Sequence, residues 1–92
     1  MAALFSGTLI AHGEECPPPP VTTASHAICL AKRFVAVRYA ENPPRWEVGY
    51  EAKEMDSYWF VHYRPTTRVL GGAGDLEIEK SSGTVKFIRG YK

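Results

Sequence analysis

The sequence has few of the features that mark a specialised class of protein. Only two of its 92 residues are cysteine and three are histidine, and Cys16 and Cys29 have no CxxC or histidine partner at a zinc-binding spacing. We therefore expect no metal and no cofactor. The formal net charge is only +1, whereas a nucleic-acid-binding face needs a strong basic excess. A nucleic-acid partner is therefore not expected. No apolar run reaches the length of a membrane span, so a membrane span is not expected either.

The small number of cysteines leaves the compartment of the chain open. Cys16 and Cys29 could form a disulfide in an exported protein and would stay reduced in the cytosol. The stretch "ALFSGTLIA", Ala3–Ala11, resembles the apolar core of a secretory signal but has no basic region in front of it. Residues 1–13 are therefore either a truncated signal peptide or an extra strand or tail, and the expected location is the bacterial cytoplasm or periplasm.

What the sequence does contain is the composition of one folded domain. Hydrophobic residues make up 45% of the chain and aromatic residues 12%, which are ordinary values for a globular protein. The four prolines of Pro17–Pro20 lack amide donors and favour an extended conformation. We expect them to act as a linker at the end of an N-terminal extension, residues 1–21, in front of a domain over residues 22–92.

A helix is predicted from Ala24 to Ala40. The threonines of Thr22–Thr23 can cap its first turn, and Pro43–Pro44 cannot continue it. Apolar residues recur on one broad face of this helix, and the other face is expected to be exposed. The extended prolines could then lie across an exposed Cys29 and bring Cys16 near it. The residues expected to face inward are Ala24, Ala27, Ile28, Leu30, Ala31, Phe34, Val35, Val37 and Tyr39. Those expected to face outward are Ser25, His26, Cys29, Lys32, Arg33 and Ala36.

Four strand-like segments follow the helix. "WEVGYEAKE", beginning at Trp46, and "DLEIEK", residues 75–80, alternate between apolar and polar residues. "YWFVHYR", residues 58–64, is apolar on both phases, as in a central strand. "TVKFIRGYK", residues 84–92, returns after a hairpin turn with Gly83 at the positive-φ position. Short connections favour antiparallel neighbours, so the fold class is α+β, with one N-terminal helix packed on a four-stranded antiparallel sheet.

The residues do not assemble into a recognisable catalytic site. Gly71–Gly74 precede a strand rather than a helix, so they do not form a phosphate-binding loop. His62 lies in the aromatic strand, and Asp56, Asp75 or Glu79 could supply a carboxylate, but no spacing selects one of them. We therefore expect no enzyme. The alternative is a small enzyme in which an acid/base pair such as His62 and Asp56 lies in a cone-shaped pocket.

Aromatic and charged residues of the sheet instead favour a surface for a protein partner. One helix covers only one face of a four-stranded sheet, so some of the aromatic rings are expected on the other face. The aromatic strand and the loop from Pro65 to Gly74 are the hypothetical contact surface. Tyr, Trp and Arg are enriched at binding hot spots. The alternative is a core in which a further strand covers these rings. The predicted partner-binding residues are Tyr58, His62, Arg64, Arg68 and Tyr91.

Four segments carry a resemblance to a known family: "AICLAKRFVAVRYAENPP", "YWFVHYRP", "GGAGDLEIEKSSGTV" and the closing "GYK". The tryptophan-containing strand, the Gly-Gly before a strand and the acidic-Lys-x-x-Gly hairpin resemble the NTF2-fold immunity domain family of small bacterial immunity proteins. The resemblance runs from the helix to the last residue. The extra helices of a full NTF2 cone are absent, which implies a reduced NTF2-like or cystatin-like fold. A second immunity group and inhibitory domains of the peptidase-propeptide type are similar as well.

The resemblance implies a non-catalytic binding protein that neutralises a cognate bacterial toxin, or another enzyme, by occluding it. Each member of such families matches its own toxin, so no functional residue carries over to this chain. The alternatives are an NTF2-like enzyme and a peptidase-propeptide-like inhibitory domain. The identity of the toxin and the oligomeric state stay open.

Overall fold

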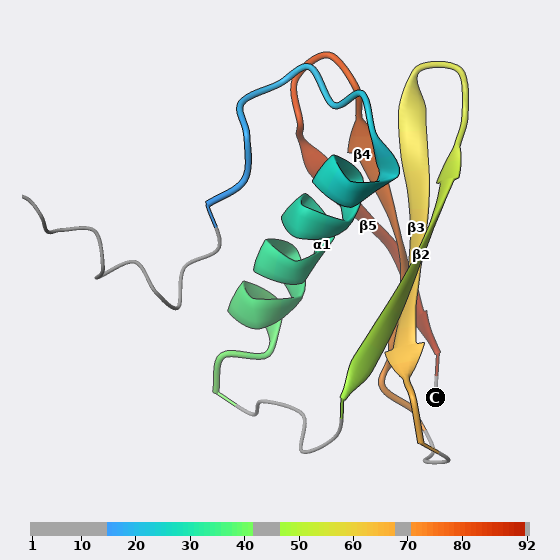
Figure 1. The fold of residues 1–92 in the computed structure, drawn as a ribbon. Helices are drawn as coiled ribbons and strands as arrows, with labels where there is room; N and C mark the ends of the chain where they lie inside the picture. The colour runs from blue at the N-terminus through green and yellow to red at the C-terminus, as the bar shows by residue number, and fades with distance from the viewer. Residues whose placement is uncertain (1–14, 42–46, 68–70, 92) are drawn as a thin grey trace, which may run out of the picture.

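A computed structural model describes residues 15–41, 47–67 and 71–91 of the chain. The described elements are α1 (Ala24–Arg38), β2 (Val48–Glu54), β3 (Tyr58–Pro65), β4 (Ala73–Glu79) and β5 (Val85–Tyr91). The strands form one sheet in the order β2-β3-β4-β5, and every neighbouring pair is antiparallel. Figure 1 shows α1 lying against one face of this sheet. The predicted α+β fold class is thus confirmed, while Trp46, expected in the first strand, lies outside the described residues.

The helix begins and ends for local reasons. Thr23 is its N-cap, and the Thr23 hydroxyl accepts a hydrogen bond of 3.1 Å from the backbone N–H of His26. Tyr39 is the C-cap, so the helix ends two residues before Ala40. Arg38 occupies the last turn, where a cation is favoured by the helix dipole.

The inward face of α1 is narrower than the sequence predicted. Its buried stripe includes Ala27, Ala31 and Val35. Val37, predicted to face inward, is 77% exposed, because it lies two residues after Val35 and therefore points about 200° away around the helix axis. Ala24 is exposed as well. A single sheet offers one contact surface, so the fully buried apolar residues recur at a spacing of four, while Leu30 and Phe34 pack against the core only in part.

The Pro-rich segment Cys16–Val21 is part of the folded unit rather than a linker outside it. Val21 is 1% exposed, its N–H donates to the carbonyl of Lys80 at 2.7 Å, and its carbonyl accepts a hydrogen bond of 3.0 Å from Trp59 Nε1. Cys16 and Cys29 form a disulfide. The packed structure therefore begins before residue 22, the expected start of the domain.

His26 is buried because the same segment passes over it. It was predicted to face outward, but only 7% of it is exposed, and its Nε2 donates a hydrogen bond of 2.8 Å to the carbonyl of Pro17. The helix pattern alone contained no information about this second layer, since the layer comes from residues that precede the helix.

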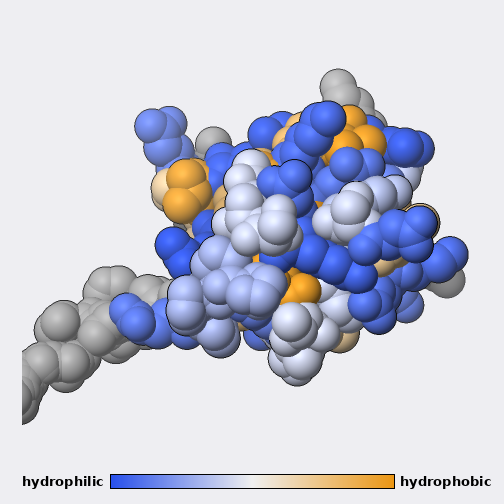
Figure 2. Space-filling view, turned by 90° about the horizontal axis from the view of Figure 1, so that it is seen from above, coloured by the Kyte–Doolittle hydropathy of each residue, from blue (hydrophilic) through white to orange (hydrophobic). Residues whose placement is uncertain are grey.

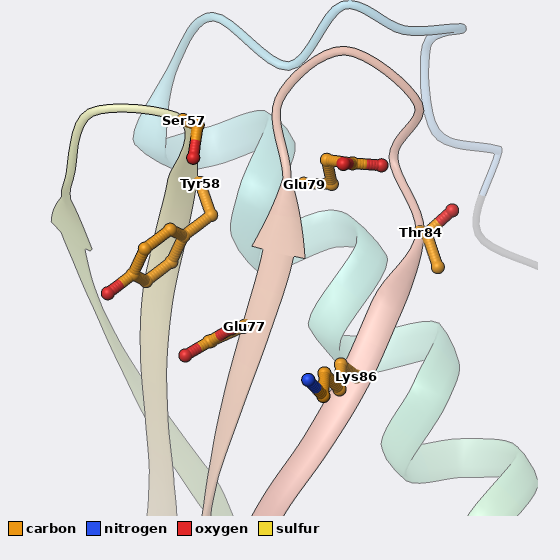
Figure 3. A pocket seen from close by; sticks show the side chains of 6 residues that line it. All are labelled: Ser57, Tyr58, Glu77, Glu79, Thr84 and Lys86. Carbon is orange, nitrogen blue, oxygen red and sulfur yellow. The ribbon is translucent and has the colours of Figure 1, made fainter.

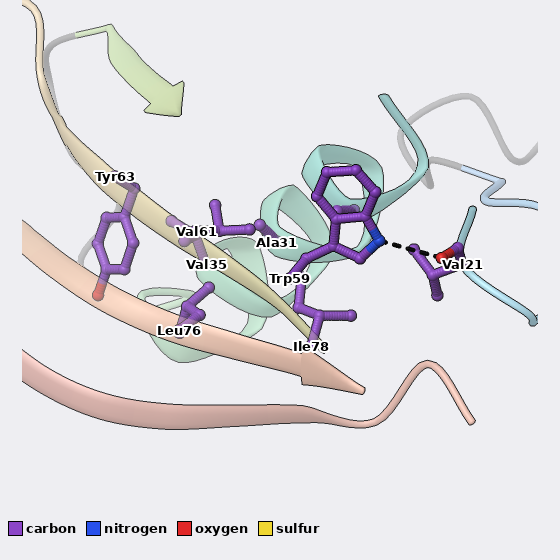
Figure 4. Packing of buried hydrophobic residues seen from close by; sticks show 9 residues of the cluster. Val21, Ala31, Val35, Trp59, Val61, Tyr63, Leu76 and Ile78 are labelled. Carbon is purple, nitrogen blue, oxygen red and sulfur yellow. Dashed lines mark hydrogen bonds between the residues drawn. The ribbon is translucent and has the colours of Figure 1, made fainter. Parts of the chain in front are cut away.

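The core lies between α1 and the sheet (Figure 4). From β3 it takes Trp59, Val61 and Tyr63, and from β4 it takes Leu76 and Ile78. These side chains alternate along their strands and point to the face that α1 covers. The alternation expected for β4 is confirmed, and β3, predicted as a central strand that is apolar on both phases, lies between β2 and β4 with its intervening residues on the opposite face.

Two glycines have definite structural roles in the sheet. Gly83 has φ of 77° in the β4–β5 hairpin, as the turn requires. Gly74 pairs with Tyr63 across β3 and β4, and a Cβ at Gly74 would lie 2.4 Å from the Tyr63 hydroxyl oxygen. The absence of a side chain at Gly74 is what allows the Tyr63 ring to lie over β4.

Candidate functional site

One face of the sheet, here called the open face, points away from α1. None of the described elements lies over it (Figure 1). On β3 the alternation places Tyr58, Phe60, His62 and Arg64 on this face, because Trp59, Val61 and Tyr63 point into the core. The open face therefore combines aromatic rings with charged side chains.

Asp75 is the best-buried polar residue of the open face. Only 2% of it is exposed, although it belongs to the layer that faces away from the helix. One carboxylate oxygen, Oδ1, accepts a hydrogen bond of 2.7 Å from His62 Nδ1. The other, Oδ2, accepts one of 2.5 Å from the Tyr91 hydroxyl, and Arg89 Nε lies 3.5 Å from the same oxygen. We call these four residues the Asp75 cluster.

The donors of the cluster keep Asp75 ionised. Burial by itself opposes the charged form, but the hydrogen bonds from Tyr91 and His62 and the charges of His62 and Arg89 outweigh it, so the pKa of Asp75 lies below its ordinary value. The hydrogen bond to Asp75, together with burial, raises the pKa of Tyr91. The carboxylate is therefore a fixed acceptor that orients both neighbours.

The ionised carboxylate also sets the tautomer of His62. A carboxylate only accepts hydrogen bonds, so Nδ1 of His62 must carry the proton. Nε2, the other ring nitrogen, has no partner among the residues that the structure describes. The His62 side chain is 29% exposed, and its ring meets the Tyr91 ring edge-on, with centroids 5.8 Å apart. His62 thus presents an oriented nitrogen to whatever approaches the open face.

A β-bulge in β5 brings Arg89 and Tyr91 into this cluster. Leu76 pairs with Phe87 and Asp75 pairs with Arg89, so Ile88 is the extra residue. An extra residue reverses the alternation of side chains after it. Without the bulge, Arg89 and Tyr91 would point toward the helix side together with Phe87.

A shallow depression lies at the other end of the open face, beside Tyr58 (Figure 3). Its volume is about 270 Å³, and it is lined by Ser57, Tyr58, Glu77, Glu79, Thr84 and Lys86. Glu77 pairs with Lys86 in the β4–β5 register. At the end of the molecule shown in Figure 2, small hydrophobic areas lie among hydrophilic side chains. That end of the molecule is thus mixed in character rather than continuously apolar.

The structure brings together two of the predicted binding residues. His62 and Tyr91 meet at Asp75, whereas Tyr58 lies at the opposite end of β3, beside the depression. Arg64 is exposed on the open face beyond His62. Arg68 lies outside the described residues, as do residues 68–70 of the proposed contact loop.

His62 pairs with Asp75 rather than with Asp56, the example chosen for an acid/base pair. Asp56 lies in the turn between β2 and β3, near Tyr58, whereas His62 is four residues further along β3. From the sequence, Asp75 was only one of three carboxylates that could pair with His62. The signal that could have selected it is its position on the polar phase of β4, but the register between β3 and β4 was also needed.

Comparisons with known proteins do not place the chain in a family: no family model matches it, and neither a curated protein nor a solved structure is significantly similar. Among residues 15–41, 47–67 and 71–91, no three His, Cys, Asp or Glu side chains gather as metal ligands. The described part of the chain also holds no helix with the length and hydrophobicity of a membrane span.

Proposed function

We propose that this chain is a non-catalytic binding protein that neutralises a cognate bacterial toxin by occluding it. The observation that carries the proposal is the Asp75 cluster: a buried carboxylate accepts hydrogen bonds from His62 and Tyr91 and so orients both on a sheet face that no described element covers. Side chains already fixed in one orientation lose little entropy when they bind. The bacterial toxin as the partner comes from the family resemblance of the sequence.

The surface around the cluster fits a protein partner. Tyr58, Phe60, His62 and Tyr91 offer large, flat side chains, and tyrosine is among the commonest hot-spot residues. Arg64, which is exposed, adds a guanidinium at the same face. Aromatic anchors surrounded by charged residues are typical of protein interfaces, whose centre is apolar and whose rim is polar.

The disulfide bears on the compartment in which the chain would bind its partner. Disulfides persist in oxidising compartments and are rare in the bacterial cytoplasm. The Cys16–Cys29 bond therefore favours the periplasm, of the two locations that the sequence allowed.

The contact between His62 and Asp75 also favours a second candidate, an enzyme that uses His62 as a general base. A carboxylate that holds Nδ1–H leaves the lone pair of Nε2 free to take a proton from a substrate or a water molecule. The binding function is preferred because the other polar groups of the cluster, the Tyr91 hydroxyl and the Arg89 guanidinium, are directed at the Asp75 carboxylate rather than at Nε2 of His62. The two candidates differ in stoichiometry: an inhibitor acts at a ratio of one to one, whereas an enzyme acts repeatedly.

The test is co-expression with the product of the adjacent open reading frame in a sensitive bacterium, in cytoplasmic and exported forms. We expect the exported chain to restore growth. The variants Tyr58→Ala, His62→Ala and Arg64→Ala should weaken binding of the purified partner by about 5- to 30-fold where the residue is a hot spot. Ser25→Ala, an exposed change at the helix N-terminus, is the matched control and should bind like the unmodified chain.

The outcomes separate the candidates. Equimolar titration to complete inhibition, with weaker binding in the open-face variants, supports the inhibitor. Protection at a small fraction of one equivalent that disappears in His62→Gln supports the enzyme. Unchanged affinity in all three alanine variants would exclude the open face as the contact surface, and a harmless neighbouring gene product would remove the toxin as the partner.

A further inference from the structure

A second surface lies on the other side of the sheet, where α1 meets β5. A shallow groove of about 300 Å³ runs between them and is lined by Leu30, Arg33, Phe34, Val37, Gly83 and Val85. Val37 at its rim is the most exposed large hydrophobic residue of the described chain, at 77%. The groove is separate from the Asp75 cluster and does not depend on the function proposed above.

The outer edge of β5 borders this groove. β5 is the last strand of the sheet, and no described strand pairs with its outer side. An unpaired edge offers a row of backbone donors and acceptors to any extended segment that comes beside it. The bulge at Ile88 interrupts the ladder, so the regular part of the edge is Val85–Phe87.

Charge is segregated between the elements. α1 and β5 carry only basic residues and no acidic ones, namely Lys32, Arg33, Arg38, Lys86 and Arg89. The charged residues of the three other strands are mostly acidic. The acidic ones are Glu51, Glu54, Asp75, Glu77 and Glu79, and the basic ones are Lys53 and Arg64. Three of the basic residues lie near β5: Arg33 lines the groove, Arg38 lies over the Phe87 ring and Lys86 belongs to β5 itself, whereas Lys32 lies over Tyr50 of β2. A segment docked along β5 would meet positive charge.

The side chains of β5 alternate between the two faces of the sheet, and this alternation determines which residue types would suit each position of a docked segment. Val85 and Phe87 point to the helix side, where they pack against the core, while Lys86 points to the open face opposite Glu77. In a strand added beside β5, neighbouring residues would alternate in the same way. Apolar residues would enter the groove on the helix side, and acidic residues would lie beside Lys86.

We propose that the α1–β5 groove binds an extended protein segment with alternating acidic and apolar residues, which adds a strand to the edge of β5. The shortest matching pattern is apolar–acidic–apolar, with the acidic residue beside Lys86 and the apolar pair in the groove near Val37. Backbone hydrogen bonds supply affinity in this mode of recognition, and the alternate side chains supply specificity. A nucleic acid would use the basic residues but not the strand edge or the groove.

The test uses the full chain, labelled with ¹⁵N, and the acetylated and amidated peptide EVEVEVE as the probe. We expect saturable chemical-shift changes in α1 and β5, and slower hydrogen exchange of amides in Val85–Phe87. KVKVKVK is the charge control, and EEEEVVV has the same numbers of valine and glutamate as the probe without most of the alternation. Both should bind at least about fivefold more weakly, because one loses the charge match and the other the match to the pleat.

Variants of exposed residues show whether the groove itself is used. Lys86→Glu and Val37→Asp should each weaken binding of EVEVEVE by about fivefold or more, whereas Lys53→Glu, on the distant edge strand β2, should change it less than about twofold. Unchanged melting temperatures would show that all three variants fold. Equal binding of EEEEVVV, absence of protection in β5, or tight binding of a DNA duplex that displaces the peptide would each overturn the proposal.

Discussion

At the scale of single residues, the open face depends on one buried carboxylate. Asp75 accepts hydrogen bonds from His62 and Tyr91 and lies within 3.5 Å of Arg89. A buried carboxylate without such donors would raise its pKa and lose its charge. The donors reverse that tendency, so the same contacts hold the fold together at the C-terminal strand and orient the side chains of the candidate site.

The variant Asp75→Asn should lower the free energy of unfolding by about 1–3 kcal/mol at neutral pH, because hydrogen bonds to a charged acceptor are lost in a buried site. The pKa of Asp75 is lowered in the folded state. Its contribution is therefore present above the unfolded value, about 4, and is lost as pH falls through the folded value. Urea unfolding from pH 7 to pH 2 should show the two proteins converging below about pH 4. A constant difference across this range would contradict the assignment.

A second residue-scale prediction concerns Gly74. The variant Gly74→Ala should cost about 1–3 kcal/mol, because its Cβ would overlap the Tyr63 ring. The control is the same change in a Tyr63→Leu background, where the ring is absent and the cost should shrink. Urea unfolding of the four proteins gives the coupling energy directly. Additive effects would show that the ring and the glycine are independent.

At the scale of elements, the segment Cys16–Val21 behaves as a strap. It is tied at one end by the disulfide to α1 and at the other by Val21, which bonds to Lys80 and receives the Trp59 indole. The strap joins the helix to the ends of β3 and β4. It also explains why His26 is buried on a side of the helix that the sequence pattern marks as polar.

Replacing both cysteines, Cys16→Ser with Cys29→Ser, should lower stability by about 2–4 kcal/mol, because the bond closes a loop in the unfolded chain. Its ends lie 13 residues apart in sequence. Thermal unfolding with and without a reductant gives the control: the reductant should destabilise the unmodified chain and leave the serine variant unchanged. Equal melting temperatures for the oxidised chain and the serine variant would show that the noncovalent contacts of Val21 and Pro17 hold the strap without the disulfide.

At the scale of the whole molecule, the hydrophobic core and the open face lie on opposite sides of one sheet. The core lies only on the side of α1, and a chain of this size has little free energy to spare. Changes of buried residues on the helix side should therefore unfold the protein, whereas changes of exposed residues on the open face, outside the Asp75 cluster, should affect a partner without affecting the fold.

This division predicts the effects of matched variants. Leu76→Ala and Ile78→Ala remove fully buried side chains and should cost about 2–5 kcal/mol each. Lys53→Ala and Arg64→Ala, both exposed on the open face, should change stability by less than about 0.5 kcal/mol. Urea unfolding checks both pairs. A loss above 1 kcal/mol in Arg64→Ala, well beyond the usual range for surface changes, would show that Arg64 contributes to the fold.

The candidate site was only partly predictable from the sequence. The alternation of β3 placed His62 on one face with Tyr58 and Arg64, because side chains of a strand alternate whatever its partners are. Selecting Asp75 required the register of β3 against β4, and these strands are joined by a connection of several residues rather than a tight turn. Placing Tyr91 beside it required the bulge at Ile88, and a bulge leaves no mark in the hydrophobic pattern.

The sequence by itself determined the order of the helix and strands, the antiparallel hairpins and the turn at Gly83, since these follow from local periodicity and backbone freedom. The tertiary structure alone decided which carboxylate holds His62, which face receives Tyr91, and that the prolines form a strap over the helix. Those outcomes depend on contacts between residues far apart in the chain. Such contacts are set by packing and register, which no local pattern encodes.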